Sequence, residues 1–184
     1  MRTKPTKILA IDPGTREIGV AVLENEDLLY YGVKSIRNRK RPQQVLGEAA
    51  RIIERLIEDY RPSVLAIEKM FLIQKSGSLL IVVADEIKAA ARAAGLGIYE
   101  YAPTAVRKFI CQSGKATKRA VAEIIAGRYV ELARYLKGRS QWEKLYYANM
   151  FDAIAVGLTC YQEILANHST ASQSPSDFEI ESAV

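Results

Sequence analysis

Residues 7–12 read Lys-Ile-Leu-Ala-Ile-Asp, a run of aliphatic side chains that ends in a carboxylate. A short apolar run that is followed by a Pro-Gly turn is typical of a buried β-strand. Residues 64–68 repeat the pattern as Val-Leu-Ala-Ile-Glu. Both segments therefore predict buried strands whose last residues, Asp12 and Glu68, lie at the carboxyl ends of their strands.

The segments around these two strands predict the rest of an α/β fold. Strands at 18–23 and 28–33, joined by a polar turn, form an antiparallel meander with the first strand. Apolar residues at helical spacing predict an amphipathic helix over 43–60. The remaining elements are expected as a helix at 76–94, a strand at 98–101, a short helix after Pro103, a helix from Thr117 to Leu136 and a last helix at 145–165.

A strand that is reached through a crossover helix lies parallel to its neighbour. The order βββ-α-β-α-β-α-α thus predicts a five-stranded mixed sheet with helices on both faces. We expect one domain over residues 1–166. Residues 167–184 are rich in small polar side chains and are expected to form a disordered tail.

Composition and charge restrict the setting in which the chain acts. No apolar run is long enough to span a bilayer, and residues 1–7 lack the apolar core of a signal peptide. The spacing of Cys111 and Cys160 fits neither a metal site nor a disulfide framework, so we expect thiols in the cytoplasm (the nucleoid) or an organelle matrix. The net charge is +5, and because the tail carries −3, the rest carries +8. This balance favours a polyanionic partner, although a basic protein without one is an alternative.

The acidic residues suggest a metal site. Asp12 and Glu68 point to the same side of their strands as every second residue before them, so they converge if the strands are adjacent and parallel, ~4.8 Å apart. Close carboxylates repel each other unless a cation lies between them, and Mg²⁺ prefers oxygen ligands. Asp152 interrupts an apolar run in the last helix and is a third candidate, although it is equally compatible with a solvent-facing stripe.

Three such acids are typical of two-metal phosphoryl transfer. The chain has a single histidine, His168, in the expected tail. A histidine-based nuclease or a Ser-His-Asp hydrolase is therefore not expected.

Four segments in order resemble one family. Ile-Asp-Pro-Gly-Thr at 11–15, Ala-Ile-Glu-Lys-Met-Phe at 66–71, the basic segment from Tyr101 to Lys118 and Phe-Asp-Ala-Ile-Ala-Val at 151–156 are similar to motifs of the RuvC family. These proteins are Holliday-junction resolvases of the ribonuclease H-like superfamily. The similarity extends over residues 7–165, and four motifs at family spacing are much more specific than one.

The resemblance implies a homodimer that nicks two strands of a four-way DNA junction, with a branch-migration helicase as a possible partner. It implies that Asp12, Glu68 and Asp152 bind Mg²⁺, for which Mn²⁺ would substitute, and that Lys118 approaches the scissile phosphate. Phe71 would stack on a base of the opened junction; a core position is the alternative. The helix at 76–94 is the candidate dimer interface or, alternatively, central core.

Asn149 departs from the family pattern, which has an acid or a histidine three residues before the last aspartate. An amide offers a neutral oxygen and no charge, so a metal site there would be weakened. Natural variation, a shifted ligand set and an engineered Asp→Asn change remain open.

Two basic segments contain no acid. We expect DNA contacts in 103–119, because helix N-termini attract phosphate, whereas 34–41 is equally compatible with a solvated loop. The candidate DNA-binding residues, beside Phe71, are Lys75, Arg107, Lys108, Lys115, Lys118, Arg119 and Arg39.

Other functions remain as alternatives. The Asp-Pro-Gly-Thr segment resembles the phosphate loop of sugar kinases and actin-like proteins, but those need two such domains and this chain has room for one. A junction-binding protein without catalysis and a nuclease acting on structured RNA are the other two.

Overall fold

The computed structural model describes residues 6–70, 78–137 and 140–171, and the structural statements below concern these ranges. Its sheet has the order β3-β2-β1-β4-β5. The strands are β1 (Lys7–Asp12), β2 (Glu17–Glu24), β3 (Asp27–Ser35), β4 (Val64–Glu68) and β5 (Gly97–Tyr101). β1, β2 and β3 pair antiparallel, whereas β4 pairs parallel with both β1 and β5. The predicted five-stranded mixed sheet is confirmed.

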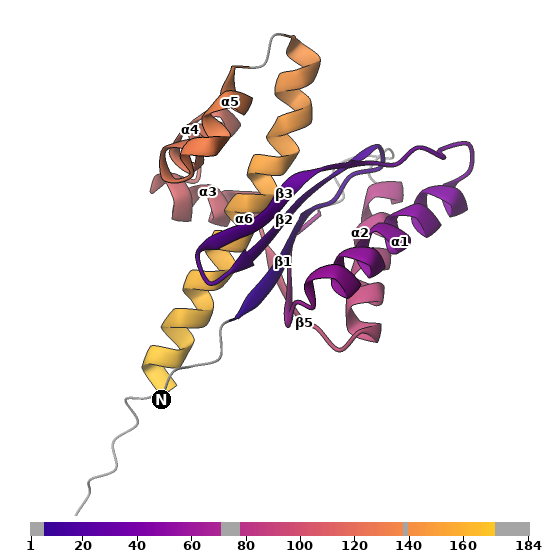
Figure 1. Cartoon of the computed structure of the whole chain (residues 1–184), viewed down its shortest axis with the longest axis horizontal. Coiled ribbons are helices and arrows are strands. Elements are labelled where there is room, and N and C mark those ends of the chain that lie inside the picture. Colours follow the sequence, from indigo (N-terminus) through magenta and orange to yellow (C-terminus); the bar gives the residue numbers. More distant parts are fainter. Residues whose placement is uncertain (1–5, 71–77, 138–139, 172–184) are drawn as a thin grey trace, which may run out of the picture.

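Helices cover both faces of this sheet (Figure 1). Figure 1 shows α1 and α2 on one side, and α6, which runs in orange to yellow, on the other side together with α3, α4 and α5. Their bounds are α1 (Pro42–Tyr60), α2 (Ser78–Ala93), α3 (Pro103–Cys111), α4 (Lys118–Arg128), the 3-10 turn η2 (Val130–Leu132), α5 (Ala133–Leu136) and α6 (Gln141–Ala171). None of these helices has the length and hydropathy of a membrane-spanning segment.

The alternation of side chains along β1 divides the core into two layers. Ile8 and Ala10 pack in the layer beneath α6, whereas Leu9 and Ile11 pack in the layer beneath α1 and α2. All four side chains are fully buried. Since side chains alternate along a strand, Asp12 is directed to the α6 side of the sheet.

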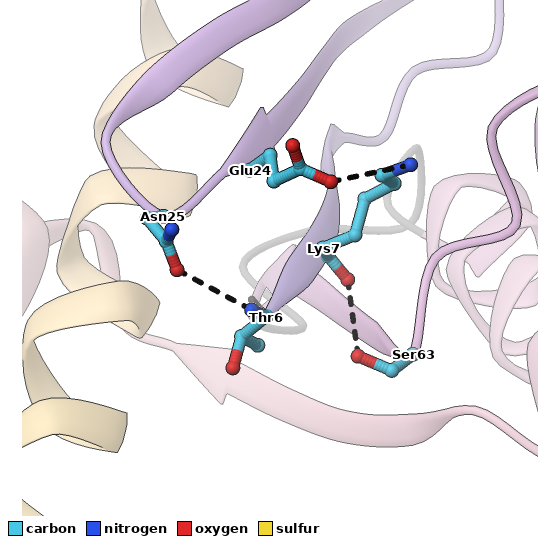
Figure 2. Close-up of polar contacts among 5 residues, drawn as sticks. All are labelled: Thr6, Lys7, Glu24, Asn25 and Ser63. Carbon is cyan, nitrogen blue, oxygen red and sulfur yellow. Dashed lines mark hydrogen bonds and ion pairs between the residues drawn. The ribbon is translucent and has the colours of Figure 1, made fainter. Parts of the chain in front are cut away.

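Polar contacts fix the register of β1 where the strand begins (Figure 2). The Lys7 ammonium lies 3.5 Å from a carboxylate oxygen of Glu24, and the hydroxyl of Ser63 donates to the Lys7 carbonyl oxygen at 3.3 Å. The amide of Thr6 donates to the Asn25 side-chain oxygen at 3.3 Å. β1 and β4 thus begin at the same level of the sheet. Their last residues, Asp12 and Glu68, therefore lie at the same level at the opposite edge.

Two predicted helices differ from those observed. The helix expected from Thr117 to Leu136 ends at Arg128, because Tyr129 adopts an extended conformation and its hydroxyl donates to the Glu26 carbonyl oxygen at 2.6 Å. The last helix is longer than expected at both ends. It continues to Ala171, so residues 167–171 of the predicted tail are helical, and residues 172–184 lie outside the described ranges.

Candidate active site

β1 and β4 bring two carboxylates to one edge of the sheet. The parallel register pairs Ile11 with Ile67, and Asp12 and Glu68 are the next residues on each strand. Asp12 is only 8% exposed, and Glu68 is half-buried. The adjacency assumed in the sequence argument is therefore present.

The third carboxylate comes from α6, which lies on the face toward which Asp12 is directed. Asp152 is 8% exposed and is flanked by the buried side chains of Phe151 and Ala153. It therefore faces the protein interior, which argues against a solvent-facing stripe. Asn149 lies one helical turn earlier, and its backbone contacts β2 at Gly19, the residue that pairs with Asp12.

The electrostatics of these groups show that they lie close together. Burial raises the pKa of Asp12 well above its ordinary value, and the negative charges of Asp152 and Glu68 raise it further. Burial likewise raises the pKa of Glu68, to about 7, with an added contribution from the charge of Asp152. Such shifts mark an excess of negative charge in a partly dehydrated place, which is common at functional sites.

Lys118 supplies the opposing charge. It is the first residue of α4, whose N-terminus is capped by the Thr117 hydroxyl accepting from the Ala120 amide at 3.2 Å. Its ammonium donates to a carboxylate oxygen of Asp152. Burial lowers the pKa of Lys118, but the charge and hydrogen bond of Asp152, helped by Asp12 and Glu68, outweigh burial and raise it. The structure thus places Lys118 beside the acids.

Within the described residues, no three carboxylate, imidazole or thiol side chains already form a ready-made metal cluster. One oxygen of Asp152 is instead bonded to Lys118. An ammonium balances part of the negative charge of the three carboxylates. The donor chemistry fits a hard cation, because Asp12, Glu68 and Asp152 offer oxygen atoms only.

Four of the predicted DNA-binding residues follow strands that end at the same edge of the sheet. Arg107, in α3, is half-buried, and its positive charge opposes the rise in the pKa of Glu68. Lys108 and Lys115 are exposed, as is Arg39 in the loop after β3. These residues follow the carboxyl ends of β5 and β3, and both strands run in the same direction as β1 and β4.

Three more residues were predicted to bind DNA: Arg119, Phe71 and Lys75. Arg119 is exposed and forms an ion pair with Glu123 at 2.8 Å, one turn along α4. Phe71 and Lys75 lie outside the described residues. The roles of all the predicted DNA contacts stay predictions.

Sequence reasoning missed two contributors to this edge. The Glu48 carboxylate accepts from the backbone amides of Arg37 and Asn38 at 3.0 and 2.8 Å, which ties the basic loop to α1. Gly19 allows α6 to approach β2 closely. Neither residue has a signal in a single sequence, because each acts through a partner in another element of the fold.

The strand order and the antiparallel meander define a class of fold, the ribonuclease H-like fold. This chain carries acids at the ends of β1 and β4 and on the last helix. The model of the family described as "Crossover junction endodeoxyribonuclease RuvC" matches residues 8–159. The chain therefore belongs to the RuvC family.

Individual relatives agree with this assignment. The chain is 30% identical over 159 residues to RuvC of Akkermansia muciniphila, covering 83% of this chain and 89% of the relative. It is 32% identical over 125 residues to RuvC of Pelodictyon phaeoclathratiforme, covering 65% of each. The chain thus spans slightly less than two thirds of the length of that second relative.

Solved structures share the fold. The structure of Thermus thermophilus RuvC superposes with a TM-score of 0.69 at 22% identity, covering 88% of this chain and 97% of the other. The yeast mitochondrial Holliday junction resolvase Ydc2 gives a TM-score of 0.64 at 13% identity, covering 91% and 85%. At these identities the likeness supports the fold alone.

Proposed function

We propose that this chain is a metal-dependent endonuclease that resolves four-way (Holliday) DNA junctions during recombination and repair. One observation carries the proposal: Asp12, Glu68 and Asp152, from three different elements, meet at one edge of the sheet in a mutually repelling arrangement. The family gives this arrangement its substrate, since T. thermophilus RuvC has been solved in complex with a Holliday junction substrate.

The three carboxylates would bind Mg²⁺, with Mn²⁺ as a substitute. The bound ions would lower the pKa of a water molecule and stabilise negative charge on the leaving oxygen. Asn149 would add one neutral amide oxygen where a fourth ligand is expected. Asp12 and Asp152 are buried residues on a strand and a helix of the core, which restricts the positions of their carboxylates.

Lys118 would exchange partners during the reaction. In the structure its ammonium donates to Asp152, although 55% of its side chain remains exposed. With Asp152 serving as a metal ligand, the ammonium would be free to contact the scissile phosphate, which is a stronger acceptor for a point charge than water. Lys118 is thereby a catalytic residue of the proposed reaction.

DNA would be held along the carboxyl edge of the sheet. Arg107, Lys108 and Lys115 on one side, and Arg39 on the other, would contact phosphates, with Arg119 and Lys75 adding charge. Phosphate contacts position the duplex without reading its sequence. Phe71 would stack on a base that the junction exposes, a contact worth ~1–3 kcal/mol.

A homodimer would let two such sites act on the two symmetric strands of a junction. The start of α2 offers a surface for it: Leu79, Leu80 and Ile81 are half-buried, and Val82 is 44% exposed. A C₂ interface buries the same patch of both copies, which suits a self-complementary helix face. A branch-migration helicase is the partner that we expect in the nucleoid or an organelle matrix.

The decisive experiment is a nicking assay on a mobile four-way junction beside linear duplex of the same sequence, with Mg²⁺ and with EDTA. We expect paired nicks in the junction that require Mg²⁺, and little cutting of the duplex. Binding without nicking would favour the junction-binding alternative created by Asn149. Preferential cutting of an RNA junction of the same sequence would favour the structured-RNA alternative.

A further inference from the structure

Two glycines lie where α6 crosses the sheet. A Cβ atom on Gly19 would lie 1.9 Å from the Asn149 carbonyl oxygen and 2.4 Å from its carbonyl carbon. A Cβ atom on Gly157 would lie 2.4 Å from the Leu23 Cδ1 atom and 3.0 Å from the Ala10 Cβ atom. Neither position tolerates a side chain without movement, and Figure 1 shows α6 passing across the strands that contain these contacts.

The two contacts differ in what must move. Beside Gly157 the nearest atom is the end of a Leu side chain, which can change rotamer, and the contact with the Ala10 Cβ atom requires a shift of only a few tenths of an ångström. Beside Gly19 the nearest atoms belong to the backbone of α6, so the helix itself would have to recede. Gly19 lies within β2, and its requirement is therefore one of space.

The Gly19 contact lies between the proposed ligands. Gly19 pairs with Asp12 in the β1–β2 ladder, and Asn149 precedes Asp152 by one turn of α6. The backbone contact of Gly19 with Asn149 therefore sets how closely the acid on the helix can approach the acid on the strand. Restoring an ordinary contact distance would move α6 outward by on the order of 1 Å, and a misplacement of that size costs about 10²-fold in rate.

We propose that Gly19 is a positioning residue of the metal site: the absence of its side chain fixes the spacing between Asp12 on β1 and Asp152 on α6. In this proposal Gly19 contacts neither metal nor DNA, and it acts by setting the distance between α6 and β2. This inference rests on the proposed function and names one residue that determines its geometry.

Gly19→Ala and the matched Gly157→Ala variant test the inference. Mn²⁺ affinity is measured without DNA by electron paramagnetic resonance, and thermal stability is measured in EDTA. We expect both variants to unfold at lower temperature. We expect Gly19→Ala to bind Mn²⁺ at least ~10-fold more weakly and to nick junctions about 100-fold more slowly at saturating DNA, with Gly157→Ala within about 3-fold of the wild type in both.

The inference is overturned if folded Gly19→Ala keeps the Mn²⁺ affinity of the wild type, or if Gly157→Ala loses as much as Gly19→Ala, since packing in general would then explain both. If Gly19→Ala does not fold, Ala21→Val enlarges the same face of β2 one step further along, and a folded Ala21→Val with unchanged Mn²⁺ affinity also overturns it. If the wild-type protein binds Mn²⁺ but does not nick junctions, the proposed function is wrong. The Mn²⁺ affinities of the variants then still test the role of Gly19. If the wild-type protein does not bind Mn²⁺, both the proposed function and the inference about Gly19 are wrong.

Discussion

At the scale of single residues, the carboxylates at the sheet edge act against the stability of the fold. Asp12 and Asp152 are each 8% exposed, and the charge of Asp152 raises the pKa of both Asp12 and Glu68. Buried like charges without a cation destabilise a native state. Functional sites often retain such unfavourable groups, so variants that lose activity here should gain stability.

Asp12→Asn is the sharpest case. The change removes one ligand and one repelling charge, so we expect nicking to fall at least ~10³-fold while four-way junction binding stays within about threefold. The unfolding temperature in EDTA should rise. Asp27→Asn, the same chemical change on an exposed residue at the opposite end of the sheet, is the control. It should leave nicking, junction binding and the unfolding temperature unchanged. An Asp12→Asn protein that still nicks at the wild-type rate with Mg²⁺ would rule out the metal site.

Asn149→Asp makes the reverse change. A carboxylate one turn before Asp152 adds charge to the ligand set, so Mg²⁺ should bind more tightly and nicking should be faster, by about 10-fold or more. The extra repulsion should lower the unfolding temperature in EDTA. Isothermal titration with Mg²⁺ and single-turnover nicking measure the two effects. An unchanged rate and an unchanged affinity would place Asn149 away from the ion.

Glu68 gives the metal-free protein a defined pH dependence. The folded pKa of Glu68 is about 7, above its ordinary value of 4.5. The folded state therefore holds the proton more tightly, and stability falls as pH rises from about 4.5 to about 7. Because Glu68 is partly exposed, its share is on the order of 1–3 kcal/mol.

Urea unfolding in EDTA at pH 5 and pH 8 measures this share. Glu68→Gln removes it, so the variant should be more stable than the wild type at pH 8, and the two proteins should be nearly equal at pH 5. Other titrating groups are common to both proteins and cancel in the difference. A stability difference that is the same at both pH values would mean that Glu68 keeps its ordinary pKa in the folded protein.

At the scale of elements, the sequence predicted the features that depend on the local pattern of side chains. The alternation in Ile8, Ala10 and Asp12, and its repeat before Glu68, gave the buried strands and the side on which the acids lie. The break at Tyr129 was not predictable, because it depends on a bond to the Glu26 carbonyl oxygen 103 residues away in the chain. The bond between Lys118 and Asp152 likewise follows from the docking of α4 on α6.

The contribution of the Tyr129 hydrogen bond to the stability of the fold can be measured. The turn before β3 holds the end of α4 through the Tyr129 hydroxyl and through an ion pair of Glu26 with Arg128 at 2.6 Å. Tyr129→Phe removes one hydrogen bond from a half-buried group, which should cost about 0.5–1.5 kcal/mol in urea unfolding. Mg²⁺ affinity should not change, because the contact lies at the end of α4 opposite to Lys118. A Tyr129→Phe protein as stable as the wild type would show that the break in the helix has another cause.

At the scale of the whole molecule, the fold gathers positive charge at the edge that carries the acids. The loop after β3 and the segment from α3 into α4 both leave that edge, and their basic side chains are largely exposed. A polyanion would thus be attracted toward the carboxylates by the surrounding charge and would approach them once cations neutralise the repulsion. The sequence predicted the two basic segments, and the topology of the sheet places them at the same carboxyl edge, after its two outermost strands β3 and β5.

This arrangement predicts how junction binding responds to salt. Each phosphate contact releases condensed counterions, so the logarithm of the association constant should fall linearly with the logarithm of salt concentration, with a slope of about −0.9 for each contact. Lys115→Ala, at the predicted DNA edge, should weaken binding and reduce the size of the slope by about 1. Arg55→Ala makes the same change in net charge on α1, where Arg55 pairs with Asp59 at 3.1 Å, and should leave the slope unchanged. Fluorescence anisotropy with a labelled four-way junction in EDTA, from 50 to 300 mM salt (a range of about sixfold that spans the steep part of the response), separates the two variants. Equal slopes for Lys115→Ala and Arg55→Ala would mean that total charge governs binding and that the carboxyl edge of the sheet has no special part in it.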